Sequence, residues 1–371
     1  MHEEASRHSG NPVFRWSARP LLALSLVVLL SPHRRAEAYP IPPQTLWELT
    51  QKAERVVWAD IGEVAQLPPR SPGDKKERHW DEGEVARLRV RESWKGTARP
   101  GELLEVHFNS GFICPAPARY EPGLAVVAFL VWEQGQWRTV GMSYGMRYPT
   151  SNDEAEAYRH AVTSAHQAHE RWTQVRLSGG AANMAAARRS WQVLAAAHPA
   201  TRWDGLYGLV PEADEEHAFF DNRAADLTSL SLAQREQLAD GFVKSPPLDR
   251  SLPMMLSALR SHPRGDVDHA AARALETVLD AEDPPYWARL AFDLLRERHG
   301  ERPEKRPVLE EDPLKRIVAR RSGEAEGAKA PSPHPLFQEW TRFKERHHLE
   351  PKPLPRTVES PVPGTGGETT L

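Results

Sequence analysis

Three histidines lie close together in a stretch of the chain that has the periodicity of a helix. They are His160, His166 and His169, and Glu170 follows directly after the last. Imidazole nitrogens are common zinc ligands, and a neighbouring carboxylate can activate a zinc-bound water for hydrolysis. The helical zinc-protease pattern has two histidines four residues apart with a glutamate after the first, whereas these histidines are six and three residues apart. A metal-dependent hydrolase is therefore an alternative prediction, beside the interpretation of a solvated helix face.

Tryptophan beside charged residues is the second feature with a defined chemistry. The chain has 12 tryptophans, and several of them stand beside charged residues. The two candidates for surface use are Trp80, within residues 75–84, and Trp203, in Arg202-Trp203-Asp204. An exposed indole next to an arginine or a carboxylate can stack on sugars, peptides or cations. We expect these four residues to bind a protein or glycan partner, and most other tryptophans to lie in the core because of their large apolar area.

The sequence gives weaker evidence for a catalytic nucleophile or a phosphate-binding loop. Ser143 stands in Met142-Ser143-Tyr144-Gly145 at the end of a predicted strand, where serine is common as a turn residue. The pair Gly179-Gly180 lacks the lysine of a phosphate-binding loop. Paired carboxylates occur, but a sequence does not show whether two of them meet in one cleft. We predict no catalytic residue and no cofactor, and a binding protein rather than an enzyme.

Residues 39–150 have the pattern of strands. Apolar and polar residues alternate over 86–91 and 104–108, which is the two-residue period of a strand with one face in water. Residues 124–132 are apolar at almost every position, as in a strand buried on both faces, and 133–136 have the composition of a hairpin turn. About five strands in this length predict a small antiparallel β-barrel, whose closure protects the strand edges.

This region also carries a series of short motifs: Ala-Glu-x-Val-Val-x-Ala at 53–59, Trp94-Lys95-Gly96, Cys-Pro-x-Pro-Ala at 114–118, and then Tyr120 with Pro122-Gly123. In this order the motifs resemble exported bacterial domains similar to the netrin-like and tissue-inhibitor-of-metalloproteinase OB-fold barrels. The resemblance covers about a third of the chain. It implies an OB-like barrel used for binding, and it suggests a protease regulator as a further alternative function.

Three residues of these motifs are expected to be structural: Trp94, Gly96 and Cys114. Cys114 is the single cysteine of the chain, so it does not form an intrachain disulfide even in an oxidising compartment. The favoured interpretation of Cys114 is a small buried hydrophobe, and the alternative is a reactive or metal-bound thiol.

From residue 151 to residue 300 the apolar residues recur with the period of helices. A long helix is predicted over 153–175, and Ser231 with Gln234 forms a capping box before a further apolar stripe. Shorter helices are predicted over 252–261, 267–279 and 285–297. Helices of this length and spacing indicate either an array of helical hairpins, loosely like HEAT or tetratricopeptide repeats, or an irregular bundle. Both interpretations predict a scaffold.

Prolines divide residues 301–371 into short segments, a composition that does not bury enough apolar surface to order itself. The exception is 336–347, where Phe337, Trp340 and Phe343 lie close to one helical face. We expect this helix to dock either on the helical part of the chain or on a partner. The rest of the tail is expected to be disordered.

The first 38 residues have the order of a secretory signal peptide. Arg15 and Arg19 precede an apolar run over 21–30, and Ala36-Glu37-Ala38 supplies the small residues of a cleavage site. The apolar run is shorter than the roughly 20 residues that span a bilayer. We expect export to the periplasm or the medium, with no transmembrane segment after cleavage. An uncleaved segment is the alternative.

Charge and composition complete the sequence-based prediction. The chain has 371 residues and a formal net charge of −3, and this mild acidic excess does not favour a nucleic-acid partner. The predicted parts are a signal peptide (1–38), an OB-like barrel domain (39–150), an α-helical domain (151–300) and a largely disordered tail (301–371). The fold class is therefore α+β with two domains. The predicted function is that of an exported, non-catalytic binding or envelope-scaffold protein.

Overall fold

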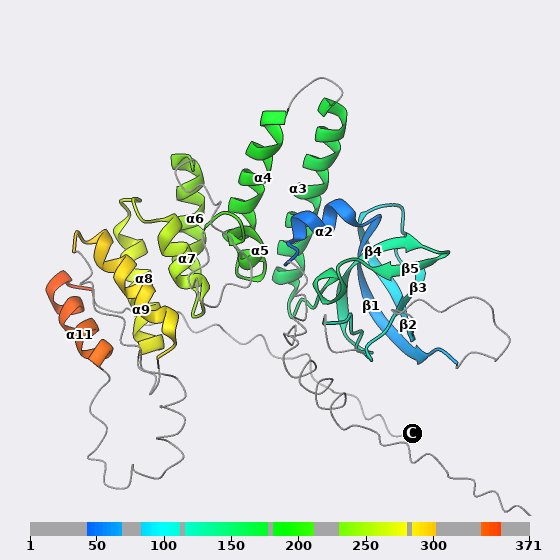
Figure 1. The fold of residues 1–371 in the computed structure, drawn as a ribbon, viewed down its shortest axis with the longest axis horizontal. Helices are drawn as coiled ribbons and strands as arrows, with labels where there is room; N and C mark the ends of the chain where they lie inside the picture. Colours follow the sequence, from blue (N-terminus) through cyan, green and yellow to red (C-terminus); the bar gives the residue numbers. More distant parts are fainter. Residues whose placement is uncertain are drawn as a thin grey trace, which may run out of the picture. The chain divides into compact units, whose positions relative to one another are not determined.

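A short helix and a six-stranded sheet form the first part of the described chain, and helices form the rest (Figure 1). This order confirms the predicted α+β fold class. The computed structural model describes residues 43–68, 83–111, 116–176, 181–210, 230–279, 284–301 and 335–349. The predicted signal peptide, Trp80, Cys114 and most of the tail lie outside these ranges, so what the sequence indicates for them stays a prediction.

The sheet has the strand order β1-β2-β3-β5-β4-β6, and β1 also pairs with β4. Its strands are β1 (Arg55–Gln66), β2 (Glu84–Lys95), β3 (Leu103–Phe108), β4 (Ala125–Glu133), β5 (Gln136–Thr139) and β6 (Met146–Arg147). All pairs are antiparallel except β3 and β5, which are parallel. The prediction of a purely antiparallel sheet is therefore wrong at this pair. The tight hairpin after β4 fixes the direction of β5, and that direction is the one in which β3 runs.

Strand β4 is buried on both faces, as its continuous apolar sequence predicts. Phe129 on one face packs in a cluster with apolar side chains of α2 (Leu46–Lys52) and α3 (Asn152–Arg176). Ala128 on the other face packs with the inward side chains of β1, β2 and β3. Side chains of the sheet and of the helices on both sides of residue 150 therefore pack in one shared cluster.

The Trp94-Lys95-Gly96 turn at the end of β2 packs against the start of β1. Trp94 is buried and its indole nitrogen donates a hydrogen bond of 3.0 Å to Glu92. Gly96 has a φ of +85°, and a Cβ atom there would lie 2.9 Å from the carbonyl oxygen of Glu54. Only glycine adopts this backbone conformation without strain, so Trp94 and Gly96 contribute to packing and chain reversal.

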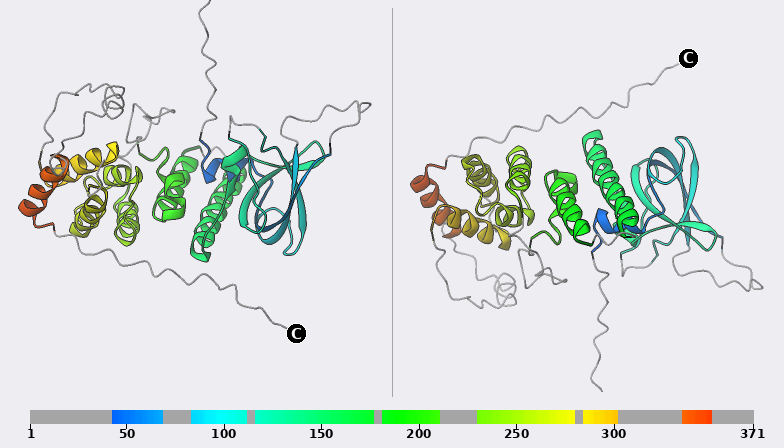
Figure 2. Two further views of the ribbon diagram at one scale, coloured as in Figure 1. Left: turned by 90° about the horizontal axis from the view of Figure 1, so that it is seen from below. Right: turned by 90° about the horizontal axis from the view of Figure 1, so that it is seen from above.

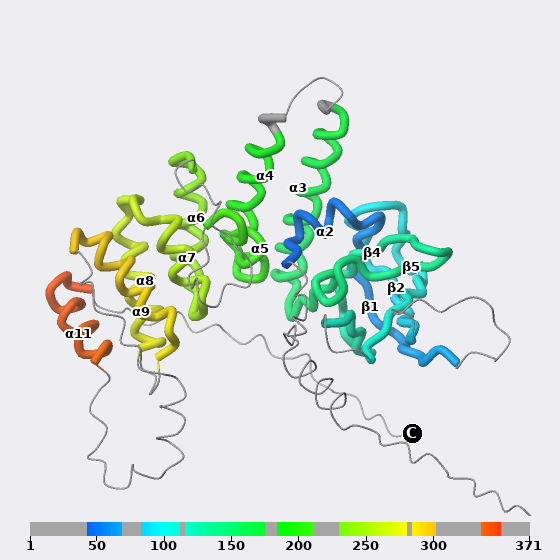
Figure 3. The backbone as a smooth tube through the Cα atoms, viewed as in Figure 1, coloured from blue at the N-terminus to red at the C-terminus, as the bar shows by residue number. Residues whose placement is uncertain are grey.

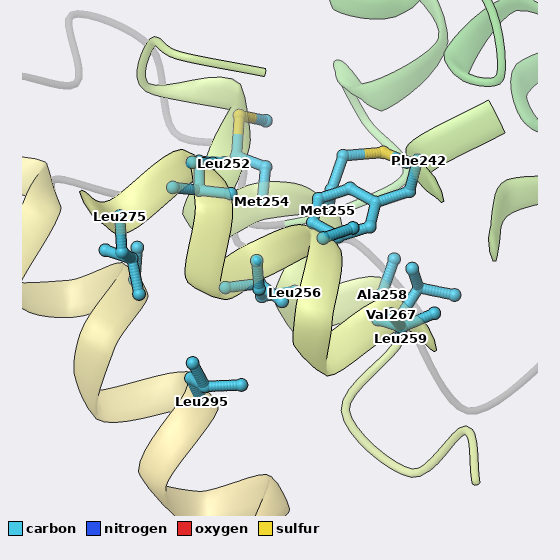
Figure 4. Close-up of a cluster of buried hydrophobic side chains, with 14 of the residues drawn as sticks. Phe242, Leu252, Met254, Met255, Leu256, Ala258, Leu259, Val267, Leu275 and Leu295 are labelled. Carbon is cyan, nitrogen blue, oxygen red and sulfur yellow. The ribbon is translucent and has the colours of Figure 1, made fainter. Parts of the chain in front are cut away.

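The helices after α3 pack in two rows. They are α4 (Ala181–Ala196), α5 (Arg202–Leu206), α6 (Leu232–Lys244), α7 (Ser251–Ala258), α8 (Gly265–Leu279) and α9 (Tyr286–Arg298). In one row α4 contacts α6 and α6 contacts α8, and in the other row α5 contacts α7 and α7 contacts α9. Figure 2 shows these helices following one another in the order of the sequence. Phe242, Leu275 and Leu295 belong to one cluster of buried side chains in this part of the chain, and Phe242 lies beside Met255 (Figure 4).

The helix predicted over 336–347 is present as α11 (Pro335–His347), and it docks on the helical part of the chain (Figure 3). Trp340 is fully buried against Phe292 and Phe343. Its indole nitrogen donates a hydrogen bond of 2.6 Å to Glu276 of α8. The docking confirms the first of the two arrangements that the sequence left open. Within the described ranges, no helix combines the length and the apolar sequence that a membrane span requires.

Polar contacts at the end of α11 centre on Glu301. Its carboxylate accepts hydrogen bonds from His347 at 2.8 Å, from Arg296 at 3.0 Å and from Arg346 at 2.5 Å. Burial alone would raise the pKa of Glu301, but these three donors lower its pKa to about 2. His299 lies beside His347, with ring centroids 4.5 Å apart, and burial lowers the pKa of His299 as well.

As the pH is lowered, we therefore expect α11 to detach from the other helices before α4 unfolds. A carboxylate whose pKa is lower in the folded state stabilises the fold above its unfolded pKa, near 4.5, and this contribution is lost as the pH falls toward 2. Hydrogen exchange measured from pH 5 to pH 2.5 should show α11 amides losing protection before α4 amides. The Glu301→Gln variant should be less protected at pH 5 and respond less to acid. Equal protection of α11 and α4 throughout would contradict the prediction.

Candidate functional site

A groove of about 600 Å³ lies between the start of β3 and the hairpin that joins β4 to β5. We call it the Trp132 groove. Two tryptophans, a leucine, two arginines and two glutamates line it: Trp132, Trp137, Leu103, Arg55, Arg87, Glu102 and Glu105. The volume falls in the range of small-molecule and peptide sites, about 300–1,000 Å³. Its lining combines apolar contact area with fixed charges.

The hairpin positions the aromatic part of the groove. Gln134 and Gly135 have φ values of 52° and 83°, the left-handed pair of a tight hairpin turn. The turn places Trp132 directly opposite Trp137, and the two rings make an edge-to-face contact with centroids 5.0 Å apart. Trp132 is nevertheless 49% exposed, and Leu103 across the groove is 58% exposed. Two large apolar side chains therefore stay in contact with water at one site.

Charged side chains of the groove are held in place by one another. The guanidinium of Arg55 lies over the ring of Trp137, 4.4 Å from its centroid, and donates a hydrogen bond of 2.9 Å to Glu102. The backbone N–H of Arg99 and then the Arg55 side chain lower the pKa of Glu102. Glu102 thus stays an anion near neutral pH, which suits an acceptor of hydrogen bonds more than a general acid.

Arg87 is the second arginine that lines the groove. It donates to Glu63 at 2.8 Å and to Glu105 at 3.2 Å, so one guanidinium joins β1, β2 and β3 on their outer face. Arginine and carboxylate groups fixed in this way beside an exposed indole give a binding surface a defined shape and charge pattern. The groove therefore combines an exposed aromatic surface with paired charges.

The three histidines predicted as metal ligands are on α3 but do not converge. His160 is exposed and pairs with Glu156 at 2.8 Å, whereas His166 lies 3.5 Å from Glu170. His169 packs against Trp47, and burial, then the charge of Lys95, lowers its pKa to about 4.

No group of three histidine, cysteine, aspartate or glutamate side chains in the described ranges is arranged to hold a metal ion. The predicted histidine cluster is therefore not formed. Six residues are about 1.7 turns of an α-helix, which puts His160 on a different face from His166 and His169.

The charged residues of Arg202-Trp203-Asp204 point into the molecule. Arg202 and Asp204 are buried, and Arg202 donates a hydrogen bond of 2.8 Å to the carbonyl oxygen of Ser245. Asp204 bonds to the start of α2 and to Arg147. The prediction that Arg202 and Asp204 are exposed for binding is therefore wrong, because both side chains are buried and form hydrogen bonds to other segments of the chain. Trp203 is partly exposed between Tyr144 and Tyr207, so ligand stacking there stays a prediction for this ring alone.

The sequence around Ser143 matches a short motif of serine hydrolases. Residue 141 is glycine, so residues 141–145 have the spacing Gly-x-Ser-x-Gly. In hydrolases this motif forms a turn between a strand and a helix, with a histidine beside the serine. Here Met142–Gly145 is a 3-10 turn that leads into the two-residue strand β6. Among described residues Ser143 bonds through its backbone to Ala116 and to no histidine, which agrees with a turn residue.

The Trp132 groove was not predicted, although the sequence carried a signal for it. Two tryptophans flank a four-residue hairpin segment at positions 132 and 137, and such positions face each other across a tight turn. Comparison of the chain with protein-family models, curated proteins and solved structures finds no match.

Proposed function

We propose that this chain is an exported binding protein whose partner lies in the Trp132 groove, and that it acts without catalysis in the periplasm or the surrounding medium. The observation that carries the proposal is the exposure of Trp132 and Leu103 together between fixed charges. Large apolar side chains that stay exposed within a charged rim are typical of interaction surfaces. Support for export comes from the charged, apolar and small segments of residues 1–38.

We further propose two domains, a barrel of the OB kind formed by β1 to β5 and a stacked helical array that serves as a scaffold. The barrel is supported by the pairings, which link β1 to β2, β2 to β3, β3 to β5, β5 to β4, and β4 to β1. The array is supported by the two rows of helix contacts. Regulation of a protease is an alternative that rests on the resemblance of the barrel.

Replacing Trp132 by alanine tests the proposal. Truncating a central aromatic residue of an interface costs about 2 kcal/mol or more, roughly 30-fold in affinity. We expect the Trp132→Ala variant of the tagged full chain to lose the partner that the unmodified chain recovers in a crosslinked pull-down from its own cells and medium. Because Trp132 is half exposed, the thermal midpoint should change little.

A matched control is Leu232→Ala on α6, where a large apolar side chain is 66% exposed away from the groove. This variant should recover the partner as the unmodified chain does. If Trp132→Ala keeps the partner, the groove is not the binding surface and the proposal fails.

A further inference from the structure

We propose that a cleft between α3 and α4 binds one medium-chain fatty acid, with the acyl chain against two tryptophans and the carboxylate on Arg171. The site is separate from the Trp132 groove and does not depend on it. The volume and lining of the cleft, the charges around it, and the nitrogens of Arg171 support the assignment.

Helices α3 and α4 lie side by side (Figure 1). They meet where the indole nitrogen of Trp191 donates a hydrogen bond of 2.7 Å to the carbonyl oxygen of Ala161. Next to this contact, a cleft of about 510 Å³ is lined by side chains from residues 164–172 of α3 and 184–194 of α4. We call it the Trp172 cleft. Its volume lies in the range of small-molecule sites, about 300–1,000 Å³.

Apolar side chains form most of the wall of the Trp172 cleft. They are Ala168, Trp172, Met184, Ala187, Trp191 and Leu194. Because the indole N–H of Trp191 is already bonded to α3, the ring offers the cleft apolar surface only. Ala168 and Ala187 are short side chains on the two facing helices, so space remains between the larger ones. A ligand that fits this wall has an apolar body.

Charge at the Trp172 cleft comes from arginine. Helix α4 has two arginines and no acidic residue, and one of them, Arg188, is paired with Glu48 of α2. On α3, Glu170 lies 3.5 Å from His166. No described carboxylate lines the cleft, whereas Arg171 does. The charge of the site therefore favours an anionic ligand.

Arg171 has donors to spare for such a ligand. Its Nε donates a hydrogen bond of 3.2 Å to the carbonyl oxygen of Gln167, one turn earlier in α3. Its two terminal nitrogens form no hydrogen bond or ion pair with the described residues. A guanidinium binds the two oxygens of a carboxylate through two such N–H groups. Since Arg171 is exposed, it places the carboxylate at the mouth of the cleft, where the charge stays in contact with water.

Larger occupants do not match the space. An α-helix with its side chains is about 10–12 Å across, so two turns of helix already exceed the volume of the cleft. A phospholipid brings two acyl chains and a phosphate group. A single acyl chain with one carboxylate uses both the apolar wall and the free nitrogens of Arg171, so the observations favour a free fatty acid.

Titration calorimetry of decanoate into the full chain near pH 7 tests the proposal. One decanoate should bind per chain. Burial of each methylene group contributes to affinity, so binding should weaken about tenfold from decanoate to octanoate and about tenfold again to hexanoate. The Trp132→Ala variant should bind decanoate as the unmodified chain does, which separates this site from the proposed function of the Trp132 groove.

Replacing Arg171 tests the carboxylate contact. Arg171→Ala should weaken decanoate binding at least tenfold and change the binding of 1-decanol, which has no charge, by twofold or less. Arg171→Lys keeps the positive charge and should recover most of the affinity. Arg89→Ala, which removes an exposed arginine of β2 outside the cleft, should leave decanoate binding unchanged.

Filling the cleft tests the acyl-chain contact. Ala187→Leu should weaken decanoate binding at least tenfold, because the longer side chain takes up space in the cleft. Ala185→Leu is the matched control, since Ala185 is exposed on the same helix and does not line the cleft. Its affinity should stay within twofold of that of the unmodified chain.

Three results would overturn the proposal: no decanoate binding, affinity that does not depend on chain length, or equal binding by Arg171→Ala and the unmodified chain. Since Arg171 is exposed, the last comparison holds even if Ala187→Leu fails to fold. Binding to anionic phospholipid vesicles without binding of decanoate would assign the cleft to a membrane surface instead. A change of oligomeric state in Ala187→Leu without decanoate binding to the unmodified chain would make it an interface between copies.

Discussion

Replacing Gly205 by alanine is expected to lower the thermal midpoint of unfolding by about 6–12 °C. The substitution should reduce the free energy of unfolding by about 3 kcal/mol, and in a chain of this size each kcal/mol corresponds to about 2–4 °C. A Cβ atom at Gly205 would lie 2.2 Å from the backbone nitrogen of Ala196 and 2.3 Å from the carbonyl oxygen of Gln192. Both atoms belong to the backbone of α4 and do not rotate away. Helix α5 would have to move off α4, and the apolar contacts of Leu206 with the core would be lost. Differential scanning calorimetry measures the shift.

Gly265→Ala is the matched control for this prediction. Gly265 begins α8, and a Cβ atom there meets nothing within 4 Å. Alanine has the higher helix propensity, so this variant should be neutral or stabilised by up to about 1 kcal/mol. A shift of less than about 2 °C for Gly205→Ala would show that α5 and α4 are not in close backbone contact.

Periodicity predicted the elements well where burial follows a regular pattern. The alternation in β2 and the 3.6-residue stripe of α3 each correspond to one buried and one wet face, so local sequence carries the information. The capping box of Ser231 and Gln234 is present at the start of α6. The hairpin after β4 was also predicted, because few residues accept a positive φ. These features depend on neighbours within a few positions along the chain.

Features that depend on distant segments were not predictable. Whether Trp132 or Trp94 is the exposed indole is decided by packing, since α2 and α3 cover Trp94 and nothing described covers Trp132 to the same extent. The parallel pairing of β3 with β5 has no local pattern. The segment Arg202-Trp203-Asp204-Gly205 has the composition of an exposed turn, but long-range contacts bury three of its four residues. A polar residue in a sequence does not reveal a buried partner 57 or 158 positions away.

Asp204 is the residue where these long-range contacts converge. It is 2% exposed, accepts a hydrogen bond of 2.8 Å from the backbone N–H of Leu46, and accepts one of 3.0 Å from Arg147. One carboxylate oxygen thus joins α5 to the start of α2 and to β6. Asp204→Ala leaves the Leu46 donor and the half-buried Arg147 guanidinium without this acceptor, and the expected cost is about 3–5 kcal/mol. Urea denaturation at pH 7 measures it.

Asp204→Asn separates the hydrogen bond from the charge. Asparagine keeps an acceptor for Leu46, so its cost at pH 7 should be smaller, about 1–2 kcal/mol. Burial raises the pKa of Asp204 despite the attraction of Arg147. A carboxyl group with a raised folded pKa stabilises most below its unfolded pKa, near 3.8, and that contribution is lost as the pH rises through the folded pKa. The difference in free energy of unfolding between the unmodified chain and Asp204→Asn should therefore become smaller as the pH rises from about 3.8 through the folded pKa of Asp204. A difference that becomes larger would mean that attraction to Arg147 outweighs the burial of Asp204.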